Sequence, residues 1–403
     1  MKKMFKILGL VVFTAIIGFT LIGANGMGGD DVIQGTPAAP RPFRDISAAQ
    51  LVSEINIGWN LGNTLDARPS DGWSSQALQE TSVSQFETMW SNPVTTETMI
   101  ATIKNAGFNA IRIPVTWFKV ADTNFNIRAD WMARVVEIVN YAVNNDMYII
   151  LDTHHDEPIF KFTNAQKAQS LNAFRRIWEQ IADTFKNYDE KLIFEGLNEP
   201  RTIGVSHEWN GGNNEERRNL NEYYQVFVDT VRASGGNNGK RILMVTTYGA
   251  SAEQAAINGL TIPADPANTI NKIIVSVHLY SPFSFAHELP GQANWNRNNS
   301  QDTQAITVPI NRAYDRFVRN GIPVILDEFG SRSEKAEAPR SAWAEFYVSH
   351  ARSKGIPCFL WDDGGWFRFF NRRDGTFYAP QVLRALMNGA SGPRPAVIEP
   401  RRR

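Results

Sequence analysis

The feature that most constrains the fold is a regular alternation of two kinds of segment along most of the chain. Short apolar or β-branched runs are separated by longer stretches with apolar residues at three- and four-residue spacing, such as "AQSLNAFRRIWEQIADTF". The short runs are typical of strands buried on both faces, and the longer stretches are typical of amphipathic helices. Strands that alternate with helices run parallel, because the helices form the crossover connections.

The number of these units indicates the architecture. Helix-like stretches such as Thr96–Ala106 and Trp131–Asn144 lie between the strand-like runs. Eight units of this kind predict a single-domain α/β fold of the (β/α)8 (TIM) barrel type, with a doubly wound open sheet as the alternative. The strand-like runs are Ile55–Asn60, Asn109–Pro114, Tyr148–Asp152, Leu192–Leu197, Ile242–Thr246, Ile273–Val277, Pro323–Leu326 and Pro357–Leu360.

Polar and aromatic clusters at the carboxyl ends of these runs favour the barrel. An open sheet gathers such residues at one crevice, whereas a barrel draws its site from many strand ends at one face. No glycine-rich phosphate-binding fingerprint follows any of the runs, which also disfavours a nucleotide-binding sheet. The clusters are "GWNLGNTLD", "RIPVTW", "DTHHDE", "LNEP", "TYG", "HLYSP", "DEFG" and "WDDGGW".

The N-terminus has the layout of a secretory signal. Lys2, Lys3 and Lys6 precede an apolar stretch over residues 7–22, and Ala24-Asn25-Gly26 offers a small-x-small cleavage site. We therefore expect a signal peptide over 1–26 and a secreted, periplasmic or extracellular protein without stable membrane association after cleavage. An uncleaved membrane anchor is the alternative.

The aperiodic, Gly- and Pro-containing segments at the two ends of the barrel region suggest the domain boundaries. We expect a flexible linker over 27–45, the barrel domain over 46–390 and a disordered tail over 391–403.

Composition limits the kinds of partner. The chain of 403 residues has 41 basic and 41 acidic residues, and this balance gives no indication of a nucleic-acid partner. A neutral, tryptophan-rich chain suits an uncharged substrate. Cys358 is the single cysteine, so no internal disulfide can form, and its apolar context "IPCFLW" predicts a buried, inert thiol. We expect a monomer.

Carboxylates at the ends of two strand-like runs suggest the chemistry. In "LIFEGLNEP", Glu195 falls within the fourth run and predicts a buried structural carboxylate, whereas Glu199 falls at the barrel mouth. Glu328 in "PVILDEFG" ends the seventh run in the same way. Glycoside hydrolysis uses two carboxyl groups, about 5–5.5 Å apart when the anomeric configuration is retained. Glu199 and Glu328 are therefore the candidate catalytic residues.

The motifs that carry these residues resemble a known family. "LNEP" followed by "DEFG" is similar to the pattern of glycoside hydrolase family 5, and "GWNLGNTLD", "IRIPVTW", "HHDE", "HLYSPF" and "WDDG" resemble its endoglucanase and xyloglucanase subgroup. The resemblance extends from about Ile55 to Gly364. It implies that Glu199 is the general acid/base and that Glu328 is the nucleophile.

The same resemblance implies roles for the surrounding residues. Arg112 would lie beside the nucleophile and lower its pKa, Asn198 would bind the sugar 2-hydroxyl, and Tyr280 would donate to the nucleophile. His278 would neighbour the acid/base, and Trp361 would form a floor beneath the sugar. The full set of expected substrate-binding residues is Arg112, His154, His155, Asn198, His278, Tyr280, Trp361, Asn60 and Trp59.

Further tryptophans and a histidine pair raise two additional questions. Trp209, Trp295 and Trp366 fall in loops after the fourth, sixth and eighth runs and are candidate platforms for more distant sugars.

The adjacent histidines of "HHDE" suggest zinc, but neighbouring strand residues point in opposite directions, so one ion would not reach both. We expect no catalytic metal and no cofactor, and a structural calcium ion remains open.

These observations predict a secreted, retaining endo-β-1,4-glucanase that cleaves internal bonds of cellulose-like, mixed-linkage or xyloglucan chains. A β-mannanase or other β-glycanase is the alternative within the same enzyme class. A catalytically silent carbohydrate-binding barrel is the alternative outside it.

Overall fold

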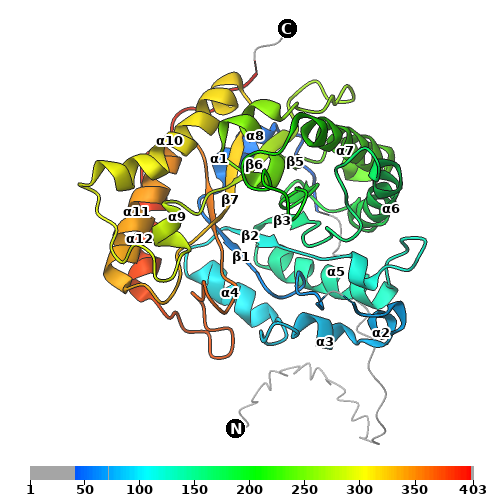
Figure 1. The fold of residues 1–403 in the computed structure, drawn as a ribbon, viewed down its shortest axis with the longest axis horizontal. Helices are drawn as coiled ribbons and strands as arrows, with labels where there is room; N and C mark the ends of the chain where they lie inside the picture. The colour runs from blue at the N-terminus through cyan, green and yellow to red at the C-terminus, as the bar shows by residue number, and fades with distance from the viewer. Residues whose placement is uncertain (1–40, 71, 401–403) are drawn as a thin grey trace, which may run out of the picture. The chain divides into compact units, whose positions relative to one another are not determined.

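The predicted barrel is confirmed. The structure is a computed structural model that describes residues 41–70 and 72–400, so the predicted signal peptide and most of the predicted linker lie outside the described residues. Eight parallel strands close on themselves in chain order, each hydrogen-bonded to its sequence neighbours and β8 to β1 (Figure 1). The strands are β1 (Gly58–Asn60), β2 (Ala110–Ile113), β3 (Tyr148–Asp152), β4 (Leu192–Glu195), β5 (Leu243–Thr246), β6 (Ile273–His278), β7 (Val324–Phe329) and β8 (Cys358–Leu360).

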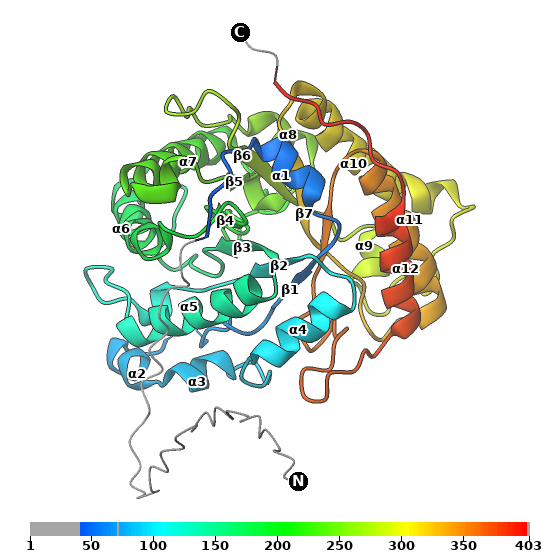
Figure 2. The same cartoon turned by 180° about the vertical axis from the view of Figure 1, so that it is seen from behind.

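Helices surround the strands on the outside of the barrel (Figures 1 and 2). The helices are α1 (Ala48–Glu54), α2 (Ser75–Glu80), α3 (Val83–Glu87), α4 (Glu97–Asn105), α5 (Ala129–Asn144), α6 (Lys167–Phe185), α7 (Asn214–Ala233), α8 (Gln254–Gly259), α9 (Phe283–Ala286), α10 (Ser300–Arg316), α11 (Glu337–Ser353) and α12 (Pro380–Ser391). Within residues 41–70 and 72–400, no helix combines the length and the apolar character that a membrane crossing requires.

The half of the barrel interior at the amino-terminal ends of the strands is apolar. Inward-facing side chains of the strands pack against Leu51 and Val52 of α1, which lies across the amino-terminal end of the barrel. Gly58 is required there, because a β-carbon at this position would lie 2.1 Å from the ring of Phe359. Cys358 is buried, as predicted, and burial raises the pKa of its thiol. This layer gives the barrel a closed floor.

The upper half of the interior is polar. Two positions further along the strands, the inward-facing residues change from Ala110, Ile150 and Ile193 to Arg112, Asp152 and Glu195. Strand alternation therefore places a layer of buried charges directly above an apolar layer. The charged layer lies at the carboxyl-terminal ends of the strands, which form the mouth of the barrel.

An irregularity in β6 and β7 brings two adjacent carboxyl groups of β7 to this layer. The register of β7 shifts between Leu326 and Phe329, and that of β6 between Ser276 and His278. Such bulges redirect side chains at barrel rims. As a result, both Asp327 and Glu328 reach the same guanidinium although they are adjacent in sequence.

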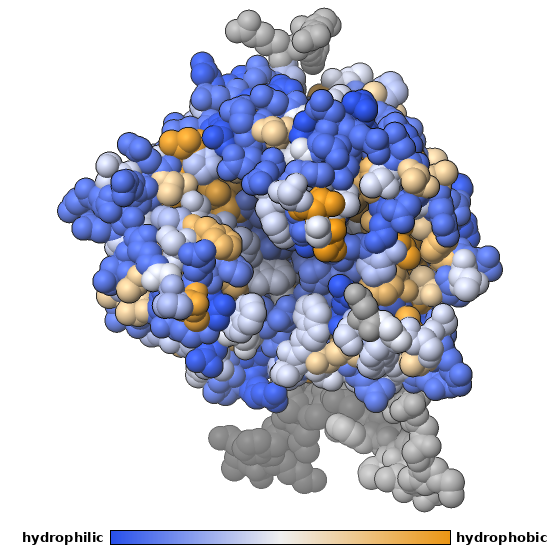
Figure 3. Space-filling model, viewed as in Figure 1, coloured by the Kyte–Doolittle hydropathy of each residue, from blue (hydrophilic) through white to orange (hydrophobic). Residues whose placement is uncertain are grey.

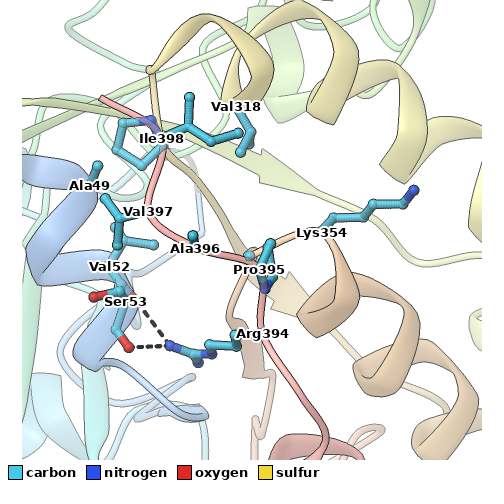
Figure 4. Close-up of a pocket in the computed structure, with 12 residues that line it drawn as sticks. Ala49, Val52, Ser53, Val318, Lys354, Arg394, Pro395, Ala396, Val397 and Ile398 are labelled. Atoms are coloured by element: carbon cyan, nitrogen blue, oxygen red, sulfur yellow. Dashed lines mark hydrogen bonds between the residues drawn. The ribbon is translucent and has the colours of Figure 1, made fainter. Parts of the chain in front are cut away.

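The C-terminal segment after α12 is bound to the opposite end of the barrel (Figure 2). The guanidinium of Arg394 donates to the backbone carbonyls of Val52, Ser53 and Ile55 at the end of α1, and a cavity of about 40 Å³ lies beside it (Figure 4). Residues 391–400 therefore make defined contacts where the sequence predicted the start of a disordered tail. The pattern "GASGPRPAVIEP" lacks periodicity because its contacts come from α1 rather than from its own regular structure.

Candidate active site

Arg112 is the centre of the charged layer. This fully buried side chain contacts four carboxylates: Nη1 lies 2.7 Å from Glu328, Nη2 2.8 Å from Asp152, and Nε 2.7 Å from Glu195 and 3.4 Å from Asp327. One guanidinium cannot keep four buried carboxylates ionised, and burial raises the pKa of Asp152 to about 6. Glu195 is a buried, hydrogen-bonded structural carboxylate, as predicted.

Glu199 and Glu328 are brought together at the mouth. Glu328 lies on β7, whereas Glu199 lies in the loop that follows β4, four positions beyond Glu195. One carboxylate oxygen of each and a ring nitrogen of His278 all lie within 4.8 Å of one another. Tyr280 donates its hydroxyl to Oε2 of Glu328 at 2.9 Å. The two candidate catalytic carboxyl groups therefore face the same small space, Glu328 from β7 and Glu199 from the loop after β4.

His278 lies between the two carboxyl groups. Its Nδ1 is 3.1 Å from Oε1 of Glu199 and 3.5 Å from Oε2 of Glu328, and its Nε2 is 3.6 Å from Oδ1 of Asp327. Burial opposes its charged form, but the surrounding carboxylates raise the pKa of His278 overall. A protonated imidazole is therefore shared among three carboxylates.

The order of proton affinities differs from the one predicted. Burial raises the pKa of Glu328 although His278 and Arg112 act in the opposite sense. Burial also opposes ionisation of Glu199, but the hydrogen bond from His278 and the nearby charges lower its pKa to about 2. Arg112 lies beside Glu328 and acts to lower its pKa, as predicted, but burial outweighs this effect in the unliganded site. The reason is that Arg112 serves four carboxylates, while His278 bonds most closely to Glu199.

Four aromatic rings lie along one side of the mouth. The rings of Trp361 and His154 are parallel within 3°, with centroids 5.8 Å apart, and Nδ1 of His154 is 2.8 Å from Asp152. His155 is partly exposed and packs beside Trp90, with ring centroids 5.7 Å apart. Trp361 is also partly exposed, and its role as a floor beneath a sugar stays a prediction.

Some predicted substrate-binding residues do not reach the mouth. Trp59 is completely buried beneath the segment that follows β8, where its ring packs against Phe370 and its ring NH donates to Asp362. Asn60 is also completely buried, and its amide donates to the carbonyl of Asp327. Both predictions were wrong, because each side chain is enclosed by internal packing or held by internal hydrogen bonds. Trp295 is likewise buried, at 4% exposure, rather than open to a sugar.

Arg112 and Asn198 act one layer below the surface. Arg112 has no exposed surface, and Asn198 is 2% exposed, with its Oδ1 accepting from Nη2 of Arg112 at 2.8 Å. Arg112 therefore positions Glu328 and Asn198 rather than contacting a substrate itself.

The histidine pair does not behave as predicted. His154 and His155 lie beyond the end of β3, and their rings meet at 4.5 Å instead of pointing in opposite directions. Together with Asp66 they place three possible ligand atoms within 4.8 Å of one another. Both oxygens of Asp66 already accept backbone amides, from Asn63 and Thr64. A metal ion there would compete with the bonds that hold this turn.

Several residues at the mouth were not singled out by the sequence. Trp90 and Arg68 line an open cavity of about 420 Å³ beside His155. Arg201 lies beside Glu199, with Nη1 2.9 Å from its carbonyl and 3.5 Å from Oε2. Figure 3 shows the mouth face with a recess near its centre and hydrophobic side chains beside it. Trp90 was missed because it lies in a long connection between strands rather than at a strand end.

The fold and the site together define the class of protein. Two carboxyl groups that face each other at the mouth of a (β/α)8 barrel, beside a partly exposed tryptophan, are the arrangement of a glycoside hydrolase. Residues 74–365 match the family described as cellulase (glycosyl hydrolase family 5). The chain belongs to glycosyl hydrolase family 5.

Known relatives agree with this assignment. The chain is 39% identical to the cellulase/esterase CelE of Acetivibrio thermocellus over 97% of its own length, but it spans only 47% of that protein. It is 38% identical to endoglucanase A of Clostridium longisporum, covering 88% of this chain and 68% of the relative.

Solved structures agree as well. A GH5-4 broad specificity endoglucanase from Ruminococcus champanellensis with bound cellotriose has a TM-score of 0.81 and 41% identity, covering 86% of this chain and 100% of that one. A lichenase from Caldicellulosiruptor sp. F32, solved in complex with cellotetraose, has a TM-score of 0.79 and 37% identity, covering 89% and 99%.

Proposed function

We propose that the protein is an endo-β-1,4-glucanase that hydrolyses internal bonds of cellulose-like, mixed-linkage β-glucan or xyloglucan chains with retention of configuration. The observation that carries the proposal is the approach of the Glu199 and Glu328 carboxylates to within 4.8 Å. This separation suits direct attack by one carboxylate and leaves no room for a water molecule between the second carboxylate and the sugar, as inversion requires. The endoglucanase names of the relatives support the same activity.

In the proposed first step, Glu328 attacks the anomeric carbon and the bond to the leaving oxygen breaks. The carboxylate electron pair forms a glycosyl ester while Glu199 gives the leaving oxygen its proton. Tyr280 and Arg112 bind Glu328 from two sides and fix the attacking oxygen. In the second step Glu199 accepts a proton from water, which displaces Glu328 and restores both carboxyl groups.

The arrangement around His278 supplies the proton for this cycle. In the unliganded site His278 and Glu199 hold one proton between them across 3.1 Å. When that proton resides on Glu199, the carboxyl can act as the acid and the imidazole is neutral. The histidine therefore keeps a proton beside the leaving oxygen although the pKa of Glu199 itself is low.

The cavity beside His155 suits the sugars on the non-reducing side of the cleavage point. Trp90 offers a flat face for a sugar ring, and Arg68 offers hydrogen-bond donors for its hydroxyls. An open cavity of this kind leaves space for substituents on the chain, which supports activity on xyloglucan in addition to unbranched glucan.

A reducing-sugar assay over cellulose derivatives, mixed-linkage glucan, xyloglucan and mannan tests the substrate class. We expect hydrolysis of the glucans, and NMR of the first product should show the β-anomer. Hydrolysis of mannan alone would replace the proposal with a mannanase. Binding without any hydrolysis would leave a carbohydrate-binding barrel, and an α-anomer as first product would exclude Glu328 as nucleophile.

Export is proposed separately. The motif that supports it, Lys2, Lys3 and Lys6 before an apolar stretch, lies outside the described residues. N-terminal sequencing of the protein from the culture medium or periplasm should begin after residue 26. Recovery of the intact N-terminus in the membrane fraction would support the anchor instead.

A further inference from the structure

Asp327, the neighbour of Glu328 in sequence, is held in place from two other strands. Its Oδ1 accepts the hydroxyl of Ser276 on β6 at 2.6 Å, and its Oδ2 lies 3.4 Å from Nε of Arg112 on β2. Neither Asp327 nor Ser276 has any exposed surface. The carboxylate of Asp327 is therefore fixed inside the barrel, where it cannot touch a substrate.

The imidazole of His278 lies between this carboxylate and Glu199. Its Nε2 is 3.6 Å from Oδ1 of Asp327, and its Nδ1 is 3.1 Å from Oε1 of Glu199. Within residues 41–70 and 72–400, Nε2 has no hydrogen-bond partner. Asp327 is therefore the charge that this edge of the ring faces, while the opposite edge faces the proposed general acid.

Asp327 differs in charge from the two other structural carboxylates of this layer. Burial raises the pKa of Glu195, and it raises the pKa of Asp152 to about 6. Burial also opposes the ionisation of Asp327, but His278 and the other donors around the carboxylate outweigh burial and lower its pKa to about 2. Asp327 therefore carries a negative charge throughout the neutral pH range.

We propose that Asp327 is a positioning residue that keeps the proton shared by His278 and Glu199 in place, and that it thereby sets the upper pH limit of acid catalysis. The inference rests on the proposed hydrolysis and assigns to it the buried charge that retains the proton. Asp327 acts through His278 and takes no part in the bond changes. Its negative charge stabilises the state of the pair that carries the proton.

Other titratable groups face His278 and Asp327 from the neighbouring strands. The hydroxyls of Tyr280 and Tyr224 lie nearby, and burial raises the pKa of both. Asp327 is the group whose charge can be removed without altering a reacting carboxyl group or the guanidinium. The charged groups are Arg112 of β2, Asp152 of β3, Glu195 of β4, Glu199 of the loop after β4 and Glu328 of β7.

Removal of this charge should move both limbs of the pH profile of kcat/KM to lower pH. The alkaline limb reports loss of the shared proton. Burial opposes the charged form of His278, and Asp327 is one of the carboxylates that raise its pKa, so the pair should lose its proton at lower pH without Asp327. The acid limb reports ionisation of Glu328. Burial raises the pKa of Glu328 and Asp327 acts in the same direction, so this limb should also move down.

The first test uses Asp327→Asn and Asp327→Ser, which both remove the charge, and either variant decides the test if it folds. With cellotetraose, whose leaving sugar needs a proton, we expect the alkaline limb of kcat/KM to fall by about one pH unit. Ser276→Ala is the matched control, because it removes a hydrogen bond from the same carboxylate and keeps the charge. Its limbs should stay within about 0.2 pH units of the wild type, whatever the height of its plateau. Unmoved limbs in the Asp327 variants, or an equal shift in Ser276→Ala, would overturn the proposal.

An aryl cellobioside with a good leaving group tests whether the effect passes through the acid. Its first step needs little protonation, so its alkaline limb should be the same in the wild type and in Asp327→Asn. An equal shift with both substrates would show that Asp327 does not act through Glu199, and the inference would fall. A wild type that is inactive on both substrates would instead reject the proposed function itself.

The protonation of His278 can also be measured directly. The chain has six histidines, so the ring signals of protein labelled with ¹⁵N-histidine are few, and the signal that is missing in His278→Gln identifies this residue. We expect a protonated ring at about pH 7 in the wild type and a pKa lower by about one unit in Asp327→Asn. A neutral ring at that pH in the wild type would overturn the proposal without any substitution of Asp327.

Discussion

Arg112 donates from Nε to Glu195 at 2.7 Å, and neither side chain has any exposed surface. This pair holds the guanidinium whose other nitrogens contact Glu328 and Asn198. A charge so deeply buried depends on its partners, because water cannot replace them.

Glu195→Ala should therefore destabilise the fold strongly. Arg112 keeps three other carboxylate contacts in this variant, but its buried Nε loses its closest hydrogen-bond acceptor, and leaving such a donor unsatisfied costs about 3 kcal/mol. Thermal or denaturant unfolding measures the loss. Glu179→Ala is the control, since Glu179 pairs with Arg175 on the surface of α6 and such pairs contribute about 1 kcal/mol or less. Equal stability of the two variants would contradict the structural role of Glu195.

Glu199→Gln and Glu328→Gln should separate the two catalytic roles. Both substitutions should lower turnover of soluble β-glucan by a factor of about 10² or more, because each removes a group that acts in the reaction. With an aryl cellobioside bearing a good leaving group, Glu199→Gln should still release the aryl group in a rapid burst, since little protonation is needed. Glu328→Gln should give no burst. A burst of the same size and rate in both variants would refute the assignment.

Lys119 should make stability depend on pH in the alkaline range. Its buried ammonium donates to the carbonyls of Leu65 and Ala67, and burial lowers its pKa from 10.5 to about 7. Between about pH 7 and pH 10.5, Lys119 carries a proton in the unfolded chain but not in the folded protein. The free energy of unfolding should therefore rise with pH, by up to about 1.4 kcal/mol per unit.

Lys119→Met should remove this slope, which urea unfolding at pH 7, 8 and 9 measures. Lys186→Met is the control, because Lys186 lies at the surface beside Asp183. If Lys119→Met keeps the wild-type slope, the lysine is not the group responsible.

Arg394→Met should loosen the amino-terminal end of the barrel without affecting catalysis. The guanidinium satisfies carbonyls at the end of α1, and α1 covers the apolar floor. Loss of these bonds should cost about 1 kcal/mol, because the carbonyls of Val52 and Ile55 are partly buried and each loses a donor from a charged group. Calorimetry should show a lower Tm, while kcat on β-glucan stays within about twofold. A large fall in kcat at a temperature where the variant is folded would show that the segment also influences the mouth.

The strand pattern was predictable because it is a local property. A short run of apolar residues predicts a buried strand from its length and spacing alone. The strand Tyr148–Asp152 was therefore predicted with its observed bounds. Glu199 and Glu328 were predictable for a related reason. Glu199 follows a buried strand and Glu328 lies near the end of another, and the carboxyl ends of parallel strands meet at one face.

Burial of individual side chains was less predictable. Trp59 and Asn60 lie near the end of a strand, as Glu328 does, yet both side chains are completely buried. Whether a strand-end side chain faces the cleft depends on which partners the neighbouring strands present, and those partners are remote in sequence. The bound segment around Arg394 was missed for the same reason, since its contacts lie in α1, far away along the chain.

The sequence by itself determined the barrel, the closed order of its strands and the two carboxyl groups at its mouth. Periodicity and strand ends depend only on residues that are close together in the sequence. Only the tertiary structure decided how the protons are distributed between those carboxyl groups. That distribution depends on burial and on the distances from His278 and Arg112 to Glu199 and Glu328, and such distances exist only once the strands have closed into a ring.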